Sequence, residues 1–315
     1  MRVVVTGGAG FIGSHLVEKL VSRGFEVVVL DNLSSGSLEN LSSVIDRVEL
    51  KIGDVKDLKT CLEVFRGADI VYHLAANPEV RVSTVEPRVH FDENVRATFT
   101  VAEAIRMLGS VKTVVFASSS TVYGDAQVIP TPEEHPLRPI SVYGASKAAA
   151  ELLLYSYSQL YGVRVVVLRY ANIVGPRTRH GVIYDFLVKL SKNRNQLEVL
   201  GDGRQKKSYL YVDDAVEATL LAVENSTHSF SVYNIGNEDW VEVDSIAKIV
   251  CEVLGLKPEI VHVGGTPDGR GWPGDVKFML LSVERIKSLG WKPKYTSAEA
   301  VRLTAHALSR ELNLR

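Results

Sequence analysis

Short runs of β-branched residues alternate with longer amphipathic stretches over the first two-thirds of the chain. This alternation is typical of a parallel β-sheet whose strands are connected by helices that cover both faces. The expected strands are Arg2–Thr6, Glu26–Leu30, Val48–Ile52, Ile70–Leu74, Val111–Ala117 and Val163–Arg169. The expected helices between them are Gly13–Ser22, Leu58–Phe65, Pro87–Leu108 and Val142–Tyr161. The sequence therefore predicts an α/β fold built on a doubly wound parallel sheet.

The spacing of the elements becomes irregular after Arg169, which indicates a second, smaller unit. Residues 172–179 are expected to form a loop, and residues 264–274, with five glycines and two prolines, a second loop that presents Arg270 on flexible backbone. Asp213 and Asp214 stand where they would cap the helix that follows them. The remaining expected strands are Leu197–Leu200, Tyr209–Val212 and Val232–Ile235, and the remaining helices are Val182–Lys192, Ala215–Val223, Val241–Leu254 and Ser282–Leu289.

The charge and composition of the 315 residues limit the kinds of partner. A formal net charge of −1 provides no global positive field that would gather nucleic acid or an anionic membrane. Cys61 and Cys251, the only cysteines, are too few for a disulfide scaffold or a four-thiolate metal site. The sequence contains no run of about 18 apolar residues and no signal peptide. We therefore expect a cytoplasmic protein that binds a small molecule and has no metal, nucleic-acid or membrane partner.

A glycine-rich segment, TGGAGFIGSHL (residues 6–16), follows the first expected strand and opens the first expected helix. Gly7, Gly10 and Gly13 allow a tight turn, close approach of a pyrophosphate, and close packing of the helix on the strand. The free N–H groups and partial positive charge of a helix N-terminus attract the same phosphates. The glycine spacing alone is a weak signal, so the interpretation depends on the strand before it and the helix after it. The segment predicts a dinucleotide site.

Two aspartates follow the second and third expected strands. Asp31, 18 residues after Gly13, stands where an acid accepts hydrogen bonds from an adenosine ribose, and its carboxylate would repel a 2′-phosphate. This charge favours NAD over NADP. Asp54, in the segment Gly53-Asp54-Val55, could contact the adenine amino group. Taken alone, Asp31 is equally well explained as a turn or helix-capping residue, and residues 53–55 as an ordinary turn.

Tyr143 and Lys147 lie four residues apart, which places the phenol and the ammonium on one face of the expected helix. Such a pair arises readily by chance, so by itself it does not indicate a site. The hydroxyl-rich segment SSSTVYG (residues 118–124) ends the fifth expected strand. Because the carboxyl ends of parallel strands line the ligand crevice, we expect these hydroxyls and the Tyr–Lys face to meet beside the nicotinamide. A serine-rich turn and a surface tyrosine are the simpler alternative.

Taken in series, these segments resemble the extended short-chain dehydrogenase/reductase family and, within it, the NAD-dependent sugar-nucleotide epimerases. The resemblance covers nearly the whole chain. Besides the glycine-rich and hydroxyl-rich segments, it is carried by HLAA (73–76), DENVRAT (92–98), YGASK (143–147), RYANIVGP (169–176) and GDGRQKKSYLYVDD (201–214). The resemblance implies that Tyr143, Lys147 and Ser119 are catalytic, that NAD is the cofactor and that a UDP-sugar is the substrate.

The resemblance also implies two sets of binding residues. Those expected to contact NAD are Gly7, Gly10, Phe11, Ile12, Gly13, Asp31, Asn32, Ser34, Ser35, Gly36, Asp54, Val55, Leu74, Ala75, Ala76, Ser118, Tyr143 and Lys147. Those expected to contact the sugar nucleotide are Ser119, Tyr143, Asn172, Val182, Leu200, Arg204, Lys207, Arg270 and Met279. Lys207 stands where many relatives carry arginine, so Arg204 could share its role. Arg270 is expected to clamp the diphosphate, and Met279 to form the wall that admits or excludes an N-acetyl group.

The activity that the resemblance implies is interconversion of UDP-galactose and UDP-glucose through a transient 4-keto sugar and enzyme-bound NADH. Tyr143 would accept the proton of the 4-hydroxyl, helped by Ser119, once Lys147 and the oxidised nicotinamide lower its pKa toward neutrality. Relatives that dehydrate or decarboxylate the 4-keto sugar place an acid where Ser120 and Thr121 stand here. A 4,6-dehydratase, a UDP-glucuronate epimerase or decarboxylase, and a non-catalytic NAD sensor remain as alternatives.

The resemblance further implies two domains and a dimer. Residues 1–170 plus about 205–236 would form an NAD-binding Rossmann domain, and about 171–204 plus 237–315 a smaller α+β sugar-nucleotide-binding domain. In a homodimer, the expected helices Pro87–Leu108 and Val142–Tyr161 of two copies would pair as a four-helix bundle. Packing within one chain would explain the length of these helices equally well.

Overall fold

The valine-rich runs of the sequence form a seven-stranded sheet within residues 1–314, the part of the chain that the computed structural model describes. The strand order is β11-β6-β5-β4-β1-β2-β3, and every neighbouring pair is parallel. The strands are β1 (Arg2–Thr6), β2 (Glu26–Asp31), β3 (Val48–Ile52), β4 (Ile70–His73), β5 (Thr113–Ser119), β6 (Arg164–Tyr170) and β11 (Phe230–Ile235). The predicted α/β class with a doubly wound parallel sheet, a Rossmann fold, is confirmed.

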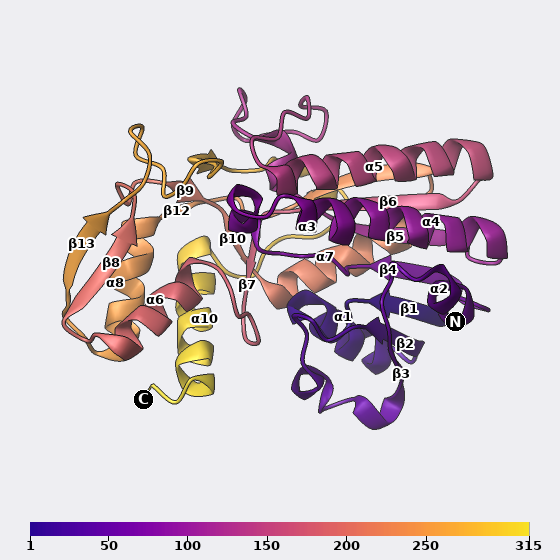
Figure 1. The fold of residues 1–315 in the computed structure, drawn as a ribbon, viewed down its shortest axis with the longest axis horizontal. Coiled ribbons are helices and arrows are strands. Elements are labelled where there is room, and N and C mark those ends of the chain that lie inside the picture. The colour runs from indigo at the N-terminus through magenta and orange to yellow at the C-terminus, as the bar shows by residue number, and fades with distance from the viewer. Residues whose placement is uncertain (315) are drawn as a thin grey trace.

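Helices cover both faces of this sheet because side chains alternate along each strand (Figure 1). On β1, Val3 and Val5 pack in the core formed with α1 and α7, whereas Val4 packs in the core formed with α2, α4 and α5. The bounds of these helices are α1 (Phe11–Ser22), α7 (Val212–Asn225), α2 (Leu58–Val64), α4 (Ala97–Leu108) and α5 (Val142–Tyr161). The direction of strand order reverses between β1 and β4, and this switch point opens a crevice at the carboxyl ends of the strands.

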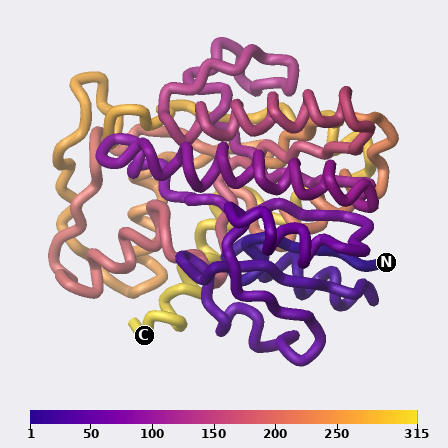
Figure 2. Tube along the Cα trace, turned by 45° about the vertical axis from the view of Figure 1, so that its right-hand side comes forward, coloured from indigo at the N-terminus to yellow at the C-terminus, as the bar shows by residue number. Residues whose placement is uncertain are grey.

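A third apolar core lies beside the sheet and is built by α6, α8, α10 and the parallel pair β8–β13. Figure 2 shows these later, pink to yellow elements grouped away from the indigo strands β1 to β3. Their bounds are α6 (Val182–Lys192), α8 (Val243–Leu254), α10 (Ser297–Glu311), β8 (Gln196–Leu200) and β13 (Glu259–Val263). The short strands beside them are β7 (Asn172–Val174), β10 (Tyr209–Tyr211), β9 (Lys206–Lys207), β12 (Val241–Glu242) and β14 (Phe278–Met279). Arg315, the end of the second expected domain, lies outside the described residues.

The expected helix Pro87–Leu108 is divided into three parts, namely α3 (Arg88–His90), a π-helical segment η4 (Phe91–Arg96) and α4. The wide turn carries Asn94, which is buried and uses both ends of its amide. Its Oδ1 accepts a hydrogen bond from Asn77 N at 3.1 Å, and its Nδ2 donates to Ser146 Oγ at 2.8 Å. The π-helical segment therefore ties the loop after β4 to α5, as such bulges often do near functional sites.

The C-terminal third departs further from the expectations. Asp213 and Asp214 lie inside the first turn of α7 and do not cap it, because the helix begins at Val212. Asp214 instead accepts a hydrogen bond from Lys294 N at 2.9 Å, which holds the segment that leads into α10. The expected helix Ser282–Leu289 shortens to α9 (Glu284–Lys287). Within residues 1–314, no helix is sufficiently long and apolar to cross a lipid bilayer.

Helix α10 is not among the helices expected from the sequence, because several small side chains on it face the core. Ala300, Thr304 and Ala305 are fully buried, so the usual pattern of large apolar residues is weak. A start signal was nevertheless present. Thr296 and Glu299 form a capping box, in which each side chain bonds the other residue's main-chain N–H. Likewise, β7 forms within the expected loop 172–179 because it pairs with β10, a partner distant in sequence.

A buried ion pair joins the carboxyl end of β6 to α5. Arg169 of β6 donates to Glu151 of α5 from Nε at 3.0 Å and from Nη2 at 2.6 Å, and both side chains are buried. Arg169 Nη1 also donates to Tyr123 Oη and to Glu133 O, each at 2.8 Å. Ser118 donates its hydroxyl to Glu151. Because each charge is surrounded by fixed partners, removing one member would leave the other buried and uncompensated.

Replacing Arg169 with methionine is expected to lower the free energy of unfolding by about 3–5 kcal/mol, because Glu151 would remain buried without a cation. Urea denaturation measures this loss. The matched control is Arg302→Met, which removes an exposed partner of Glu252 and is expected to cost less than about 1 kcal/mol. Equal losses in the two variants would contradict the structural role given to the buried pair.

Candidate active site

A cavity of about 890 Å³ opens at the carboxyl ends of β1, β4 and β5, where the strand order reverses. Its size is that of a small-molecule site. Among the described residues, five of those expected at the site do not line it, namely Gly36, Asp54, Arg204, Arg270 and Met279. The expected residues that do line it are Gly7, Gly10, Phe11, Ile12, Gly13, Asp31, Asn32, Ser34, Ser35, Val55, Leu74, Ala75, Ala76, Ser118, Ser119, Tyr143, Lys147, Asn172, Val182, Leu200 and Lys207.

The glycine-rich turn between β1 and α1 leaves space that side chains would fill. Gly7 has φ +69°, and a Cβ on it would lie 2.7 Å from Ala75 N in the turn after β4. A Cβ on Gly13 would lie 2.1 Å from Gly7 O. The N-cap of α1 is Gly10, with no side-chain cap and no acidic residue in the first turn, so the N–H groups there are open to an anion. These features fit the pyrophosphate of a dinucleotide cofactor.

Asp31 ends β2, lines the cavity and is 7 % exposed. Its Oδ2 accepts a hydrogen bond from Ala9 N at 2.9 Å, and its Oδ1 accepts one from Leu33 N at 2.8 Å. The carboxylate therefore holds the glycine-rich turn, which is the turn role considered from the sequence. Its place on the cavity wall also leaves it available to a ribose, so the two roles are compatible.

Asp54 and Gly36 do not line the cavity, and their expected contact with the cofactor stays a prediction. Asp54 Oδ2 accepts a hydrogen bond from Asn32 Nδ2 at 3.1 Å, and Asp54 Oδ1 accepts one from Lys56 N at 2.8 Å. A Cβ on Gly36 would lie 2.9 Å from Ala9 C, so Gly36 packs against the back of the glycine-rich turn. Asp54 thus bonds the lining residue Asn32, and Gly36 contacts Ala9 of the glycine-rich turn.

The residues expected to be catalytic meet at one wall of the cavity. Tyr143 and Lys147 stand one turn apart on α5, and Ser119 ends β5. Ser119 lies close enough to the Tyr143 phenol to lower its pKa, and Thr121 N donates to Ser119 Oγ at 3.2 Å. Lys147 is buried, and its Nζ donates to Ala117 O at 2.8 Å and lies 5.9 Å from the centre of the Tyr143 ring. Helix α5 thus presents a phenol and an ammonium to a hydroxyl of β5.

Burial shifts the pKa values of both titratable groups at this wall. It raises the pKa of Tyr143 to about 12, with the neighbouring Ser119 hydroxyl acting in the opposite direction. It lowers the pKa of Lys147 to about 8, opposed by the negative charge of Glu151. The expectation that Lys147 and the oxidised nicotinamide together lower the pKa of Tyr143 toward neutrality stays a prediction. In the chain alone desolvation dominates, and the Lys147 ammonium is directed at a main-chain carbonyl. Further positive charge in the cavity is needed to lower the pKa of the phenol.

The residues expected at the substrate phosphates differ in their surroundings. Asn172 Nδ2 donates to Ser208 O at 3.0 Å. Lys207 Nζ lies 2.5 Å from Asp275 Oδ1, and Asp275 is buried. The Lys207–Asp275 pair fixes one ammonium at the cavity wall as a point charge. Both Asn172 and Lys207 therefore occupy positions from which they can reach an anion in the cavity.

Arg270 does not line the cavity but lies beside it, since its Nη1 donates at 2.7 Å to the main-chain oxygen of the lining residue Asp275. Its Nη1 donates to Asp125 Oδ1 and its Nη2 to Asp125 Oδ2, each at 2.9 Å. Its Nε donates to Asp268 Oδ2 at 2.6 Å. The sequence suggests that the loop 264–274 presents this charge on flexible backbone. In the structure, the carboxylates of Asp125 and Asp268 hold the guanidinium in place instead.

Arg204 and Met279 also lie elsewhere than expected. Arg204 is exposed and its main-chain N–H donates to Asp202 at 3.0 Å. Met279 is 8 % exposed and packs in an apolar cluster with Tyr123, Val276 and Leu281. Strand β14 pairs with β9 and directs the methionine into this cluster, so Met279 forms no wall of the cavity.

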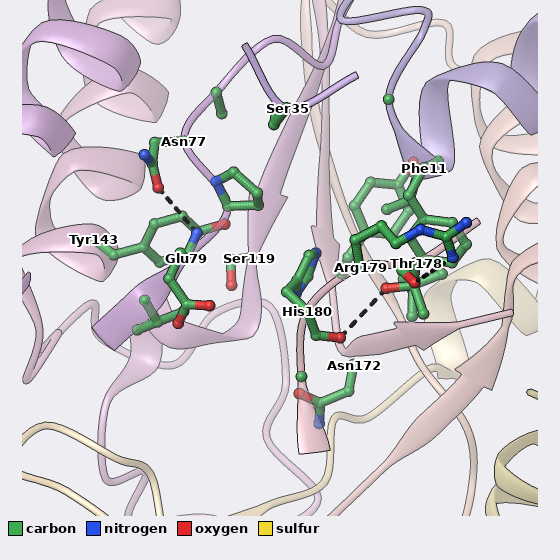
Figure 3. A pocket seen from close by; sticks show the side chains of 18 of the residues that line it. Phe11, Ser35, Asn77, Glu79, Ser119, Tyr143, Asn172, Thr178, Arg179 and His180 are labelled. Atoms are coloured by element: carbon green, nitrogen blue, oxygen red, sulfur yellow. Dashed lines mark hydrogen bonds between the residues drawn. The ribbon is translucent and has the colours of Figure 1, made fainter. Parts of the chain in front are cut away.

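Several charged or titratable residues that were not expected at the site also line the cavity, namely Glu79, Arg81, Arg177, Arg179, His180 and Asp185. Glu79 and Arg81 belong to the segment that follows β4 and leads into the 3-10 turn η3 (Val80–Thr84). Their place just beyond the carboxyl end of a parallel strand is the signal that could have found them. In Figure 3, Asn77, Glu79, Ser119 and Tyr143 lie on one side of the cavity, Phe11, Thr178 and Arg179 on the other, and His180 and Asn172 between them.

Arg177 and Arg179 connect the cavity to two helices. Arg177 Nη2 donates to Glu18 of α1 at 2.6 Å, and Arg177 N donates to Glu311 of α10 at 3.0 Å. Arg179 Nη1 donates to the same Glu311 at 2.5 Å. These ion pairs hold the loop after β7 between the glycine-rich turn and the C-terminal helix, and so define one side of the cavity.

With this geometry established, comparison with known proteins gives a family. Residues 3–236 match the NAD dependent epimerase/dehydratase family. The chain belongs to this family. Its family membership, as expected from the sequence, and its dependence on NAD at the family level are therefore confirmed. A curated relative, the UDP-glucose 4-epimerase of Mycolicibacterium smegmatis, is 34 % identical over 317 residues, which cover 96 % of this chain and 97 % of that protein.

Solved structures agree with the family and extend the range of bound ligands. A UDP-galactose 4-epimerase structure is 57 % identical, covers 99 % of this chain and 100 % of its own, and has a TM-score of 0.89. The UDP-glucose 4-epimerase of Thermus thermophilus in complex with NAD is 37 % identical, covers 98 % of each chain, and has a TM-score of 0.86. MoeE5 in complex with UDP-glucuronic acid and NAD is 30 % identical, and the match covers 99 % of this chain and 100 % of MoeE5 with a TM-score of 0.87.

Lys147→Met is expected to raise the free energy of unfolding at pH 7, because it removes an ammonium that burial disfavours. The folded pKa of about 8 lies below the ordinary value of 10.5, so the unfolded chain binds more protons between these two pH values. The cost of the ammonium is complete below the folded pKa and disappears as the pH rises to the ordinary value. Urea denaturation of NAD-free protein should show the advantage of the variant fall by about 1 kcal/mol or more between about pH 7 and pH 10. A constant difference would contradict the shifted pKa.

Proposed function

We propose that the protein is a sugar-nucleotide 4-epimerase, an isomerase of galactose metabolism that interconverts UDP-galactose and UDP-glucose with NAD as a bound cofactor. The observation that carries the proposal is the meeting of Tyr143, Ser119 and Lys147 at one wall of a cavity whose opposite end is the glycine-rich turn. The relatives with the highest identities reported above are 4-epimerases over nearly the full length of the chain.

The cavity residues fit NAD along its whole length. Gly10, Phe11 and Ile12 at the start of α1 would hold the pyrophosphate, and Asp31 the adenosine ribose. Lys147 would hold the nicotinamide ribose. When bound, NAD supplies the hydride acceptor for C4 of the sugar and the positive charge of an oxidised nicotinamide ring.

The residues of the chain supply the proton transfer. The phenolate form of Tyr143 accepts the proton of the 4-hydroxyl. Ser119 donates a hydrogen bond that stabilises negative charge on the tyrosine oxygen or on the oxygen at C4. Because burial raises the pKa of Tyr143 to about 12, the phenol becomes a useful base only when further positive charge enters the cavity. After the 4-keto sugar has turned its other face, Tyr143 returns the proton to the oxygen at C4.

The substrate side of the cavity supports a tethered diphosphate and a loosely held sugar. Asn172 and Lys207 are placed to contact the phosphates, and the partner of Lys207, Asp275, keeps that ammonium in position. Arg270 can join them only by releasing Asp125 and Asp268. Tight binding of the nucleotide retains the intermediate while the sugar rotates, so the protein should discriminate strongly between nucleotides and weakly between sugars.

The positions that distinguish dehydratases and decarboxylases carry hydroxyls here. Ser120 is buried, and Thr121 donates its hydroxyl to Ser119 Oγ at 2.9 Å. Neither can act as the second acid that elimination or decarboxylation of the 4-keto sugar requires. The catalytic tyrosine and lysine are both present, which disfavours a non-catalytic NAD sensor.

The proposal includes the two domains expected from the sequence, a homodimer and a cytoplasmic location. The division at residues 1–170 plus about 205–236, against about 171–204 plus 237–315, is supported by the separate apolar core around α6, α8 and α10. The homodimer is supported by exposed apolar side chains on two adjacent helices, α4 and α5, among them Phe99, Leu152 and Leu160. Both cysteines are free and buried, as suits a reducing compartment.

Incubating the purified protein with UDP-galactose and resolving the products by chromatography tests the proposed reaction. UDP-glucose should accumulate to an equilibrium mixture without added nucleotide, and extraction should yield NAD and little NADP. A 4-keto-6-deoxy product, loss of carbon dioxide from UDP-glucuronic acid, or no turnover with bound NAD would each support one of the alternatives.

Tyr143→Phe is expected to lower kcat at least about 100-fold, since the general base is lost while the ring remains. NAD content and the unfolding midpoint should stay near those of the wild type, because only one hydroxyl is removed. Tyr155→Phe, on the exposed face of the same helix, is the matched control and should leave kcat unchanged. Turnover near the wild-type rate in Tyr143→Phe would exclude this residue as the base.

Arg270→Ala is expected to weaken UDP-glucose binding roughly 10- to 150-fold if the guanidinium leaves Asp125 to bind the diphosphate. Asp125→Asn should act in the opposite direction and strengthen binding, because it removes a carboxylate that competes for Arg270. Titration calorimetry of the NAD-loaded protein measures both, with Arg204→Ala as the control. If Arg270→Ala binds UDP-glucose with unchanged affinity, Arg270 does not contact the diphosphate, and Lys207 and Asn172 remain as the residues proposed to bind it.

Leu152→Glu is expected to convert a dimer into a monomer, because it places a charge in the apolar face of α5. Light scattering coupled to size-exclusion chromatography measures the mass against the chain mass of 34.6 kDa. Leu303→Glu on α10 makes the same change at another exposed leucine and should leave the mass unchanged. A wild-type mass equal to one chain would contradict the dimer.

A further inference from the structure

The cavity holds a carboxylate, Glu79, to which the proposed proton transfer gives no task. Glu79 stands directly before η3 and caps that turn. Figure 3 shows Glu79 on the same side of the cavity as Tyr143 and Ser119, with His180 facing them. Because the 4-hydroxyl of the sugar must reach Tyr143 and Ser119, Glu79 borders the space that the sugar ring occupies.

Glu79 is held in place by its main chain and by one of its two oxygens. Its N–H donates to Asn77 Oδ1 at 3.0 Å, and its Oε1 accepts hydrogen bonds from Arg81 N at 3.2 Å and from Arg81 Nε at 3.4 Å. The structure gives the other oxygen, Oε2, no hydrogen-bond partner within residues 1–314. The same turn is fixed to α5, because Tyr143 N donates to Ser83 Oγ at 3.0 Å. Oε2 is therefore a preorganised acceptor at a constant place relative to Tyr143.

Glu79 shares its only ion-pair partner among the described residues with a second carboxylate. Arg81 is shared between two carboxylates, Glu79 at 3.4 Å and Asp185 at 2.8 Å. Burial lowers the pKa of His180, although Glu79 and Asp185 act in the opposite direction, so the imidazole adds no charge at neutral pH. Lys147, the nearest cation on the tyrosine side, directs its ammonium at Ala117 O. The group of Glu79, Arg81 and Asp185 therefore has one more anion than cations, and the free oxygen of Glu79 carries part of this uncompensated charge.

We propose that Glu79 makes the sugar subsite selective for uncharged hexosyl groups and excludes the 6-carboxylate of a uronic acid, an inference that rests on the proposed function. In a UDP-hexose, C6 is attached to C5, which adjoins the reacting C4, so the C6 substituent enters the region around Tyr143 together with C4. A 6-hydroxyl can donate to the free oxygen of Glu79, whereas a carboxylate there adds a like charge in a partly desolvated site. The fold itself does not exclude uronic acids, since MoeE5 shares it and is seen with UDP-glucuronic acid.

The test compares three ligands on the NAD-loaded protein. Titration calorimetry gives the dissociation constants of UDP, UDP-glucose and UDP-glucuronic acid for the wild type and for Glu79→Gln. We expect the wild type to bind UDP-glucuronic acid at least about 10-fold more weakly than UDP-glucose, and Glu79→Gln to reduce this ratio by at least about 10-fold. Glutamine keeps the oxygen that accepts from Arg81, so the turn stays intact, and the affinity for UDP should not change.

Two matched variants separate charge from structure. Glu39→Gln removes the same charge from another lining residue, at the adenosine end of the cavity, and should leave the ratio unchanged. Glu79→Asp keeps the charge with a shorter side chain and should keep most of the discrimination.

A wild-type ratio near one, or an equal effect of Glu39→Gln, would overturn the role of Glu79 and leave the epimerase proposal standing. If the wild type binds neither UDP nor UDP-glucose, the proposed function fails and the inference fails with it.

Discussion

The close approach of two turns determines the geometry of the whole site. Gly7 after β1 and Ala75 after β4 stand so near each other that a Cβ on Gly7 would lie 2.7 Å from Ala75 N. On one side of this contact, Asp31 braces the glycine-rich turn that faces the pyrophosphate. On the other side, the chain after Ala75 continues to Asn77, and Asn94 ties it to the helix that carries Tyr143. The cofactor end and the catalytic end are thus positioned from one point of contact.

Burial acts in opposite directions on the two groups that this arrangement brings together. It raises the pKa of the Tyr143 phenol to about 12 and lowers that of the Lys147 ammonium to about 8, because a desolvated site disfavours the charged form of each. The chain alone therefore keeps the phenol protonated at neutral pH, in a desolvated site where added charge has a large effect on its pKa. A cofactor that brings positive charge and stays bound would keep the base active through every turnover, while the same site without it would leave the phenol protonated.

Periodicity predicted what depends on local sequence, and missed what depends on distant partners. The strands of the central sheet and helix α5 appear within a few residues of their expected bounds, because β-branched runs and amphipathic stretches are local signals. Tyr143, Lys147 and Ser119 came together because strand ends share an edge of the sheet. Arg270 and Met279 could not be placed this way. The partner of Arg270, Asp125, lies 145 residues away, and the burial of Met279 depends on the pairing of β14 with β9.

The π-helical segment before α4 sets a limit on how this chain can change through evolution. A π turn holds one residue more than an α turn, so its length is part of the placement of Asn94. Deleting one residue between Phe91 and Arg96 would restore a regular helix, since five α-helical residues turn through about the same angle as six π-helical ones. The bulge that presents the Asn94 amide would be lost, and with it the hydrogen bonds to Ser146 and Asn77. The length of this segment is therefore tied to the contact between α5 and the loop after β4.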